Sequence, residues 1–300
     1  VYSRLLTFED SADIGDGWFH GPAVNDQTFV STACRAEVAL VHNGPYLTTF
    51  RVRTRLAVPE RFCFDRMTRS EALTDLILDS TVSLRAGCRR VEIETRVHNT
   101  ARDHRLRALF PSGAETNRCL SDTPFDVVER AIPLRADNHL YRELEVETRP
   151  QQSWCAVHDA IRGLAVVSAG QMEFAVRDLP ERPVALTLLR CTGRTVMTDG
   201  EPNGQMLGEW TFRYWLAPLA GAPDRAQLCL WGQQLAAGLR DVQLHAQDQA
   251  LLCVAGDLPP VASLFALEGG AILTSARRVG PAWELRLFNP SEQPHQVTLT

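Results

Sequence analysis

Apolar and polar residues alternate along several stretches of this 300-residue chain, and no other feature constrains its fold as strongly. In residues 50–58, apolar side chains and Thr54 take one set of alternate positions, while Arg51, Arg53 and Arg55 take the other. Successive side chains of a strand point to opposite faces, so this pattern predicts strands with one buried and one wet face. Such strands are typical of antiparallel sheets. The same alternation recurs in residues 90–97, 171–177 and 283–288.

Turn-forming sequences rich in Gly, Pro and Asn separate these stretches, and only residues 233–240 weakly resemble a helix. We therefore predict an all-β fold. A boundary is expected in the Ala- and Pro-rich residues 217–223, which follow a strong strand pattern. Residues 1–218 are predicted to form a large antiparallel sandwich. Residues 224–300 are predicted to form a smaller β-sandwich, which is expected to be truncated because its last strand runs to Thr300.

Composition limits the partners and the compartment. The formal net charge is −5, which argues against nucleic acid and anionic membranes as partners. No apolar run approaches the length of about 18 residues that crosses a membrane, and no signal peptide is recognisable. The 8 cysteines are widely spaced and form no Cys-x-x-Cys motif. This spacing predicts reduced, mostly buried thiols in a cytoplasmic protein.

The most distinctive segment is residues 8–18, which contains Asp10, Asp13 and Asp16 with two glycines and ends in Trp18. So much Asp and Gly is unfavourable inside a strand, so the segment is predicted to be a loop. Carboxylates beside an exposed aromatic ring suit a sugar site, because they accept hydroxyl hydrogen bonds while the ring stacks on the apolar face. The alternative is a cluster of Asx turns around a core tryptophan.

Other polar clusters carry weaker signals for chemistry. His158 and Asp159 are adjacent, but a zinc site needs three or four converging ligands, so a polar turn before a strand is the simpler interpretation. Several acidic residues could supply a carboxylate pair for glycoside hydrolysis, but the sequence does not give their separation. They are Asp10, Asp13, Asp16, Asp122 and Glu129. No nucleophile elbow, phosphate-binding loop or dinucleotide fingerprint is present. The chain therefore lacks any self-sufficient catalytic signature, and a metal site at His158 is not expected.

Residues 120–130 form a further cluster, in which a polar turn leads into a strand ending in Glu129 and Arg130. The Arg130 guanidinium could donate two hydrogen bonds to a carboxylate or to sugar hydroxyls. Alternatively, both residues are ordinary charges at a strand end and contribute little.

Taken in order, these segments resemble the C-terminal β region of glycoside hydrolase family 38, the α-mannosidases, and most closely its bacterial branch. Residues 10–18 resemble the family's Asp-x-x-Asp-x-Gly-Asp-x-Tyr loop. The order of the motifs and their approximate spacing hold over nearly the whole chain. The other segments that carry the resemblance are residues 89–99, 105–113, 122–130, 186–193 and 286–292.

This resemblance implies a multidomain enzyme in which an N-terminal barrel and a helical bundle carry the zinc ion, the Asp nucleophile and the acid/base. The present chain would then be a non-catalytic region without a cofactor of its own, packed on that catalytic domain. It would form most of a sandwich similar to galactose mutarotase, without the first strands, and part of a terminal sandwich. The carbohydrate partner would be an α-mannoside, and His158 would be a look-alike of the family's zinc ligands.

The family's β region also lends side chains to the rim of the sugar site. The resemblance assigns that role here to Asp13, Asp16, Trp18, Asp122 and Arg130. Trp18 stands where the family has Tyr, so the ring is kept but the hydroxyl acceptor is lost. Two rival functions remain open. One is an aldose-epimerase-like enzyme, which needs a His and a Glu in one cleft, and the other is a stand-alone carbohydrate-binding or structural sandwich.

Overall fold

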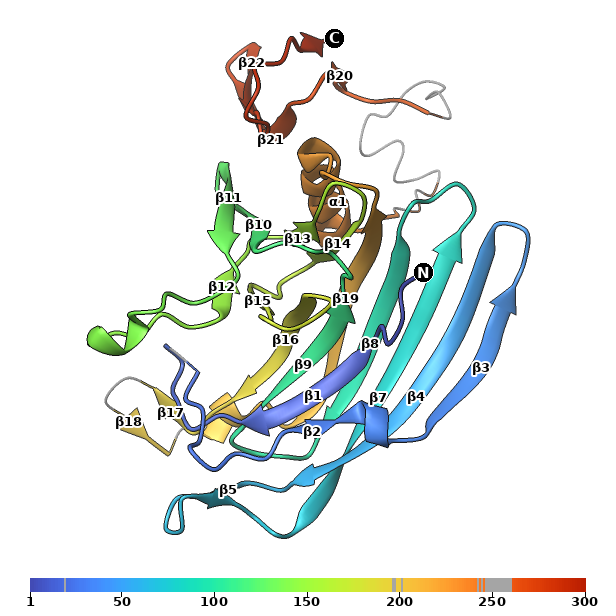
Figure 1. The fold of residues 1–300 in the computed structure, drawn as a ribbon. Helices are drawn as coiled ribbons and strands as arrows, with labels where there is room; N and C mark the ends of the chain where they lie inside the picture. The colour runs from blue at the N-terminus through green and yellow to red at the C-terminus, as the bar shows by residue number, and fades with distance from the viewer. Residues whose placement is uncertain (19, 196–197, 201, 242, 244, 246–260) are drawn as a thin grey trace.

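A computed structural model describes residues 1–300 except 19, 196–197, 201, 242, 244 and 246–260. Within these described residues, nearly every element is a strand, and the strands pair antiparallel in two large sheets (Figure 1). The prediction of an all-β sandwich with large antiparallel sheets is therefore confirmed.

The segment that contains Asp13, Asp16 and Trp18 joins two neighbouring strands of the smaller sheet. Its six strands lie in the order β12 (Thr148–Pro150), β15 (Glu173–Val176), β16 (Pro183–Cys191), β9 (His104–Pro111), β1 (Thr7–Ala12) and β2 (Phe29–Val30).

The larger sheet is strongly curved, and its longest strands lie side by side at one edge (Figure 1). Its nine strands lie in the order β11 (Asp126–Ala131), β10 (Arg118–Thr123), β13 (Trp154–His158), β14 (Gly163–Ser168), β19 (Gly208–Leu219), β8 (Val91–Asn99), β7 (Leu73–Arg85), β4 (Leu47–Pro59) and β3 (Ala36–Asn43). The alternation in the sequence corresponds to one buried and one exposed face of the strand, as predicted. In β4, Thr54 and Leu56 are buried while Arg53 and Arg55 are exposed.

The core lies between the two sheets, since apolar side chains from both belong to one buried cluster. Phe110 of β9 faces Tyr214 of β19, with ring centroids 5.6 Å apart. Both side chains are fully buried. The Tyr214 hydroxyl and the Thr95 Oγ1 lie 2.6 Å apart, which satisfies the hydroxyl inside the apolar core. This packing joins the sheets into one sandwich.

Strand β1 corrects one expectation, because residues 8–12 were predicted to be part of a loop. They belong instead to a strand that pairs with β9, from Thr7 opposite Leu109 to Ala12 opposite His104. Asp10 is tolerated in this strand because its buried carboxylate lies 2.5 Å from His104 Nδ1 and 2.5 Å from an Arg69 nitrogen. The loop proper therefore starts at Asp13.

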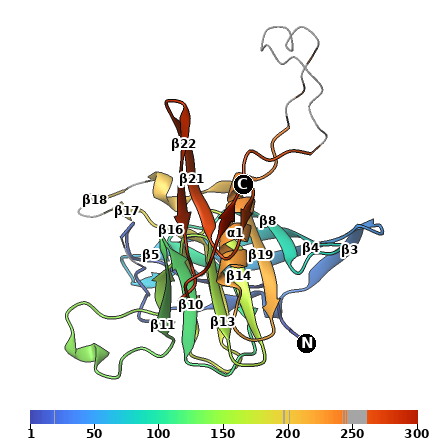
Figure 2. The same ribbon diagram turned by 90° about the horizontal axis from the view of Figure 1, so that it is seen from above.

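Helix α1 (Arg225–Ala237) packs against β13 and β14, as the view from above in Figure 2 shows. The helix was expected at residues 233–240, so its start was placed too late. Asp224 caps the true N-terminus by accepting a hydrogen bond from Gln227, and Gly238 ends the helix with a φ of 64°. Leu228 and Leu235 are buried on its sheet-facing side.

The remaining elements are short. They are the strand pairs β5 (Phe62–Cys63) with β6 (Thr68–Arg69), β17 (Arg194–Thr195) with β18 (Thr198–Asp199), β20 (Leu267–Glu268) with β23 (Thr298–Leu299), and β21 (Ile272–Val279) with β22 (Ala282–Phe288), and the 3₁₀ turns η1 (Ser31–Ala33), η2 (Asn138–Leu140) and η3 (Pro202–Gln205). The described cysteines carry free thiols, and Cys253 lies outside the described residues.

Candidate functional site

The β1–β2 loop is built around the buried carboxylate of Asp13. Its Oδ1 accepts hydrogen bonds from the backbone N–H groups of Gly15 and Gly21, each at 3.1 Å, and its Oδ2 lies 2.8 Å from Arg190 Nε. A Cβ on Gly21 would lie only 2.4 Å from the Gly15 nitrogen. The loop can therefore close on Asp13 only because a glycine occupies position 21.

This closed loop presents Trp18 to solvent, with 84% of the residue exposed. Asp16 Oδ1 accepts a hydrogen bond of 2.7 Å from the Trp18 backbone N–H, and Arg190 Nη2 donates to the Asp16 carbonyl at 2.9 Å. Both contacts fix the backbone that carries the indole ring. An exposed ring with a fixed backbone can stack on a flat apolar partner such as a sugar face.

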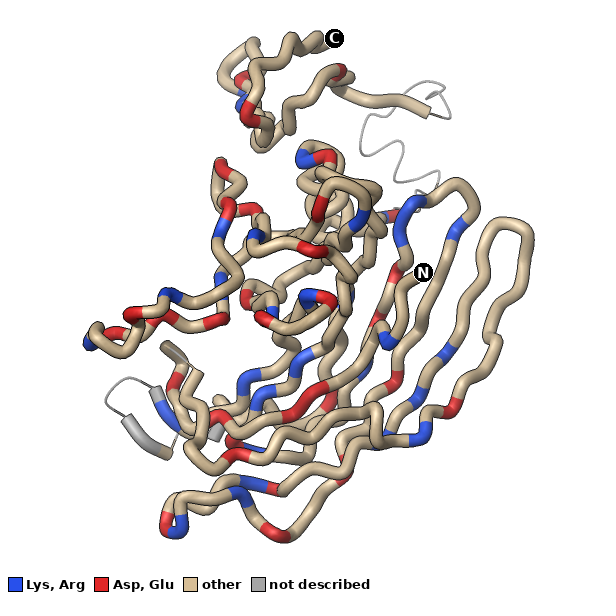
Figure 3. The backbone as a smooth tube through the Cα atoms, viewed as in Figure 1, with Lys and Arg blue, Asp and Glu red and all other residues tan. Residues whose placement is uncertain are grey.

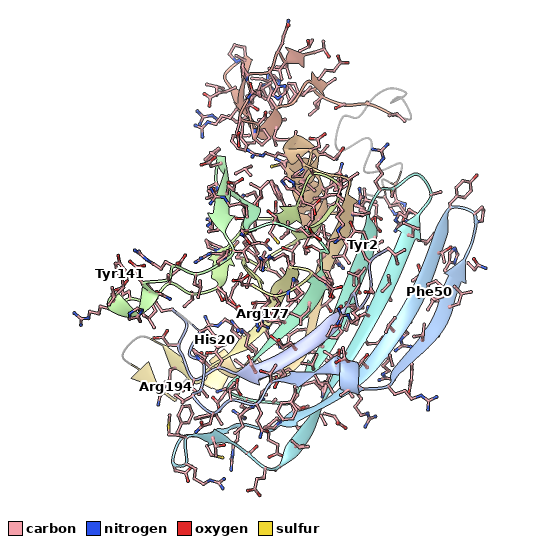
Figure 4. The ribbon with its side chains drawn as sticks, in the orientation of Figure 1. Tyr2, His20, Phe50, Tyr141, Arg177 and Arg194 are labelled. Carbon is pink, nitrogen blue, oxygen red and sulfur yellow. The ribbon has the colours of Figure 1, made fainter. Side chains whose placement is uncertain are left out.

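A cleft of about 640 Å³ opens beside this loop. Trp18 and His20 line one side of it, and the segment between β11 and β12 lines the other side through Asn138 and Leu144. Figure 4 shows His20 and Tyr141, which belongs to that second segment, on the same side of the molecule. The charged side chains that the smaller sheet contributes to the lining are Arg105, Arg149, Glu173 and Arg190.

The second wall of the cleft is held by hydrogen bonds within its own segment. The Asn138 side chain donates to the Glu145 carbonyl at 2.8 Å and accepts from the Glu145 backbone N–H at 2.7 Å. The Glu145 carboxylate lies 2.6 Å from an Arg149 nitrogen. These contacts give a chain segment with little regular secondary structure a defined shape.

Below the cleft, acidic and basic side chains neutralise each other across β1 and β9, whose red and blue segments lie side by side in Figure 3. Arg107 contacts Glu9 Oε1 at 2.5 Å and Glu147 Oε1 at 2.8 Å, and Arg177, labelled in Figure 4, contacts Glu9 Oε2 at 2.8 Å. Burial raises the pKa of Glu147, but Arg107 and Arg177 lower it by more. Glu147 is therefore a carboxylate in the folded chain at neutral pH.

His20 differs from these paired groups. Its Nε2 is buried, and no described residue forms a hydrogen bond with that atom. Burial, together with the positive charge of Arg105, lowers the pKa of His20 to about 4. His20 is therefore neutral at physiological pH and brings a polar ring without charge to the cleft.

Asp122, a predicted site residue, has a carboxylate that is surrounded by hydrogen-bond donors from residues 152–154. Its Oδ1 accepts from the backbone N–H groups of Gln152, Ser153 and Trp154 at 3.1, 2.8 and 2.9 Å, and its Oδ2 accepts from the Ser153 hydroxyl at 2.5 Å. Both oxygens are thus engaged by the chain itself, and Asp122 joins β10 to the start of β13.

Arg130 lies on β11, next to β10. Its Nη1 donates to the Ser121 hydroxyl at 2.6 Å, and this hydroxyl donates to the Pro150 carbonyl at 3.2 Å. Pro150 lines the cleft, whereas Arg130 is not among the described residues that line it. The structure therefore brings Asp13, Asp16 and Trp18 together in one loop. Arg130 lies outside the cleft lining and is connected to Pro150 in that lining through the Ser121 hydroxyl.

His158 is the last residue of β13, and Asp159 begins the turn that leads into β14, so the predicted polar turn starts one residue after His158. Asp159 accepts hydrogen bonds of 2.8 to 2.9 Å from the backbone N–H groups of Glu115, Ile161 and Arg162, and these bonds lower its pKa to about 2. Across the described part of the chain, no three His, Cys, Asp or Glu residues form a group that could hold a metal ion. These residues do not fit a zinc site, and no chemical step through zinc is derived for them.

Of the residues that line the cleft, only Trp18 was predicted; His20, Arg105 and Arg190 are among those that were not. Arg105 and Arg190 fall within segments that carry the family resemblance, residues 105–113 and 186–193, but their strand pattern alone gives no site role. Their neighbours in the cleft come from distant parts of the chain, so sequence spacing contains no sign of the cluster.

A family model described as "Glycosyl hydrolases family 38 C-terminal domain" matches residues 1–195. The chain belongs to this family. The family predicted from the order of the motifs is thereby confirmed. One curated relative, from Halalkalibacterium halodurans, is described as a "Putative mannosylglycerate hydrolase". It is 25% identical over 320 residues, which cover 97% of this chain and 33% of that protein.

Two solved structures from Enterococcus faecalis share the fold. One is an alpha-mannosidase, with a TM-score of 0.83, 24% identity and coverage of 99% of this chain and 34% of the other. The second is a glycosyl hydrolase family 38 protein, with a TM-score of 0.79, 24% identity and coverage of 99% and 36%. This family 38 chain thus spans about a third of the length of its relatives. None of its described helices is long and apolar enough to cross a membrane.

Proposed function

We propose that this chain is the non-catalytic C-terminal β region of an α-mannosidase-type glycosidase that hydrolyses α-mannosides with retention. The family match over residues 1–195 carries this proposal. The relatives, about three times longer, support it because they have room for a separate catalytic part. In this proposal, the catalytic part is the chain's partner and lies outside these residues. It holds the zinc ion, the nucleophile and the acid/base.

Within that enzyme, we propose that the Trp18 loop forms part of the rim of the sugar site. Trp18 would stack on the sugar, because its ring is exposed and borders a cleft. Asp13 and Asp16 would hold the loop, since their carboxylates accept backbone hydrogen bonds within it. Asp122 and Arg130 would shape the opposite wall through the strands that carry them.

We also propose a division into domains and a location. Residues 1–218 would form the large sandwich domain and residues 224–300 a small C-terminal one, because the Ala- and Pro-rich residues 217–223 separate the strand patterns. A cytoplasmic location is supported by the wide spacing of the 8 cysteines.

The test is a Trp18→Ala variant of the full-length protein, assayed with an aryl α-mannoside. We expect kcat/KM to fall roughly tenfold, the loss that about 1.4 kcal/mol of stacking and apolar contact would cause, with little change in the melting temperature. Trp283→Ala is the matched control, because Trp283 is also exposed but belongs to β22, away from the cleft lining. Equal kinetic losses in both variants would refute the rim role of Trp18.

The aldose-epimerase alternative requires a His and a Glu in one cleft, and His20, Glu147 and Glu173 do line the same cleft. However, Glu147 is bound by Arg107 at 2.8 Å, and Glu173 accepts a hydrogen bond from Thr187 at 2.6 Å. Each carboxylate thus already has a partner in the chain, and the arginines beside Glu147 lower its pKa, which makes it a weaker base. Polarimetry of α-D-glucose and α-D-galactose with the purified protein tests this: accelerated mutarotation that is lost in His20→Ala would favour the alternative.

A further inference from the structure

The loop that carries Trp18 is attached to a strand two places away in the smaller sheet. The loop leaves β1 after Ala12, whereas Arg190 belongs to β16, and β9 lies between these two strands. Arg190 Nε donates to Asp13 Oδ2 at 2.8 Å, and Arg190 Nη2 donates to the Asp16 carbonyl at 2.9 Å. One guanidinium therefore contacts both the start of the loop and the residue two positions before Trp18.

These contacts are largely shielded from water. The Asp13 side chain is fully buried, and 18% of the Arg190 side chain is exposed. Little water competes for the hydrogen bonds, so they are stronger than those of an exposed ion pair. A buried carboxylate is unfavourable without a cation beside it, so loss of the guanidinium would weaken the anchor on which the loop is built.

The base of the loop also has hydrogen bonds that do not involve Arg190. The Ile14 N–H donates to the Gly21 carbonyl at 2.8 Å, and the Gly15 and Gly21 N–H groups donate to Asp13. The contact between Arg190 and the Asp16 carbonyl lies further along the loop, near its tip. We therefore expect the loop to form without Arg190 but its tip to be held less firmly to the sheet.

Trp18 depends on that tip for its position. With 84% of the residue exposed, the indole has little packing of its own, so the backbone determines where the ring lies. A ring on a moving tip would have to be ordered when a sugar binds, and that ordering would reduce the affinity.

We propose that Arg190 is a positioning residue that acts through Trp18, because it holds the loop tip on the smaller sheet and so places the indole before the sugar binds. This inference rests on the proposed function, since it explains how the rim role of Trp18 is achieved. Arg190 itself lines the cleft, and a direct contact between Arg190 and the substrate would give a different result in the experiment below.

The experiment is a double-mutant cycle in the full-length protein, assayed with an aryl α-mannoside. R190Q should lower kcat/KM by roughly three- to tenfold, chiefly through a higher KM, because the indole must then be ordered on binding. In a W18A background, R190Q should change kcat/KM by less than about twofold, because the ring through which Arg190 acts is absent. Equal losses with and without Trp18 would overturn the inference, since Arg190 would then act independently of that ring.

R190K provides a conservative variant for the same cycle. Lys keeps the charge beside Asp13 but has no planar fork that could contact Asp13 and Asp16 together, so the loss in kcat/KM should be smaller than in R190Q. This smaller loss should also disappear in the W18A background. R190K thus carries the test if R190Q does not fold, and a loss in R190K that persists without Trp18 would overturn the inference.

R182Q is the matched control for general destabilisation. The Arg182 side chain is 19% exposed, close to the 18% of Arg190, and its Nε donates to the Thr116 carbonyl at 2.7 Å. Arg182 is not among the described residues that line the cleft. R182Q should lower the melting temperature and leave kcat/KM unchanged. A loss of kcat/KM equal to that of R190Q would mean that destabilisation alone explains both variants and would overturn the inference.

Amide hydrogen exchange separates this inference from the proposed function. In the full-length protein, the peptides that carry the Gly15, Trp18 and Gly21 amides should exchange at least about tenfold faster in R190Q, as expected from loss of a hydrogen bond to a charged group, and R182Q should leave them unchanged. If W18A lost no activity but R190Q still accelerated this exchange, the rim role would fail and the positioning of the loop by Arg190 would stand. Unchanged exchange in R190Q would overturn the inference whatever the activity of W18A.

Discussion

At the scale of single residues, the sandwich keeps a charged cluster in its interior, centred on Asp10. One carboxylate oxygen lies 2.5 Å from His104 Nδ1, and the other lies 2.5 Å from an Arg69 nitrogen. The opposite ring nitrogen of His104 lies 3.0 Å from Asn99 Oδ1. His104 and Asp10 are both fully buried, so water does not solvate the charge of the His104 ring and its protein neighbours must favour it.

This cluster predicts a stability that depends on pH. Burial, the strongest influence, lowers the pKa of His104, but Cys191 and Asp10 together raise it to about 10. The side chain of an unfolded His has a pKa of about 6.5. The contribution of charged His104 to the free energy of unfolding is therefore complete below that pH and is lost as the pH rises toward about 10. We expect the free energy of unfolding in urea to fall by at least about 1 kcal/mol between about pH 6.5 and 9.5.

Asp10→Asn provides the comparison, because it removes the carboxylate that favours the charged His104. The variant should be less stable overall, and its free energy of unfolding should change less over the same pH range. If the curves of the variant and the wild type ran parallel, the link between His104 and Asp10 would be wrong.

A second prediction concerns Asp122, whose carboxylate accepts four hydrogen bonds, three of them from the backbone N–H groups of Gln152, Ser153 and Trp154. Asp122→Ala leaves those buried donors unpaired and should lower the free energy of unfolding by roughly 1–3 kcal/mol. Asp126→Ala is the control, since exposed Asp126 accepts one hydrogen bond from the adjacent Val127 N–H. Urea denaturation that finds the two variants equally stable would rule out the structural role of Asp122.

Sequence reasoning at this scale found residues whose type is unusual for their surroundings. Trp18 and Asp13 stand out among glycines, and the structure places both in the loop beside the cleft. Arg105 and His20 do not stand out, because the chain has many arginines and a lone His has many roles. Their neighbours in the cleft come from distant parts of the chain, and only the folded chain shows which groups surround them.

At the scale of elements, the β1–β2 loop depends on glycine at one position and not at another. A Cβ on Gly21 would collide with the Gly15 backbone at 2.4 Å, whereas a Cβ on Gly17 would meet nothing within 4 Å. We expect Gly21→Ala to lower the free energy of unfolding by roughly 1–3 kcal/mol and Gly17→Ala to stay within about 0.5 kcal/mol of the wild type. Thermal denaturation of both variants measures this, and a harmless Gly21→Ala would contradict the close approach.

Two elements show why sequence boundaries failed. Strand β1 was not predicted because Asp is unfavourable inside a strand. The side chains that pair with Asp10, His104 and Arg69, come from distant segments of the chain. Helix α1 was placed too late because its packing beside the start of β13 is a tertiary feature. A Cβ added at Gly232 of the helix would lie only 2.1 Å from the Ser153 hydroxyl oxygen. In both cases long-range contacts decided the local structure.

At the scale of the whole molecule, the class of fold followed from the strand alternation, but the assignment of strands to two sheets did not. The alternation in residues 50–58 and that in residues 171–177 look alike, yet they belong to β4 of the larger sheet and β15 of the smaller one. Pairings such as β1 with β9 join segments far apart in the chain. Alternation reports which face of a strand is buried, and it does not identify the strand's neighbour.

The last prediction concerns what the 300 residues can do alone. The purified chain with added zinc should not hydrolyse an aryl α-mannoside, while the full-length protein should, because the proposed zinc ligands, nucleophile and acid lie outside this chain. Far-ultraviolet circular dichroism should show the β content, so that absence of turnover is measured on a folded chain. Zinc-dependent turnover by the chain that survives His158→Ala would place the catalytic residues here and refute the proposed role.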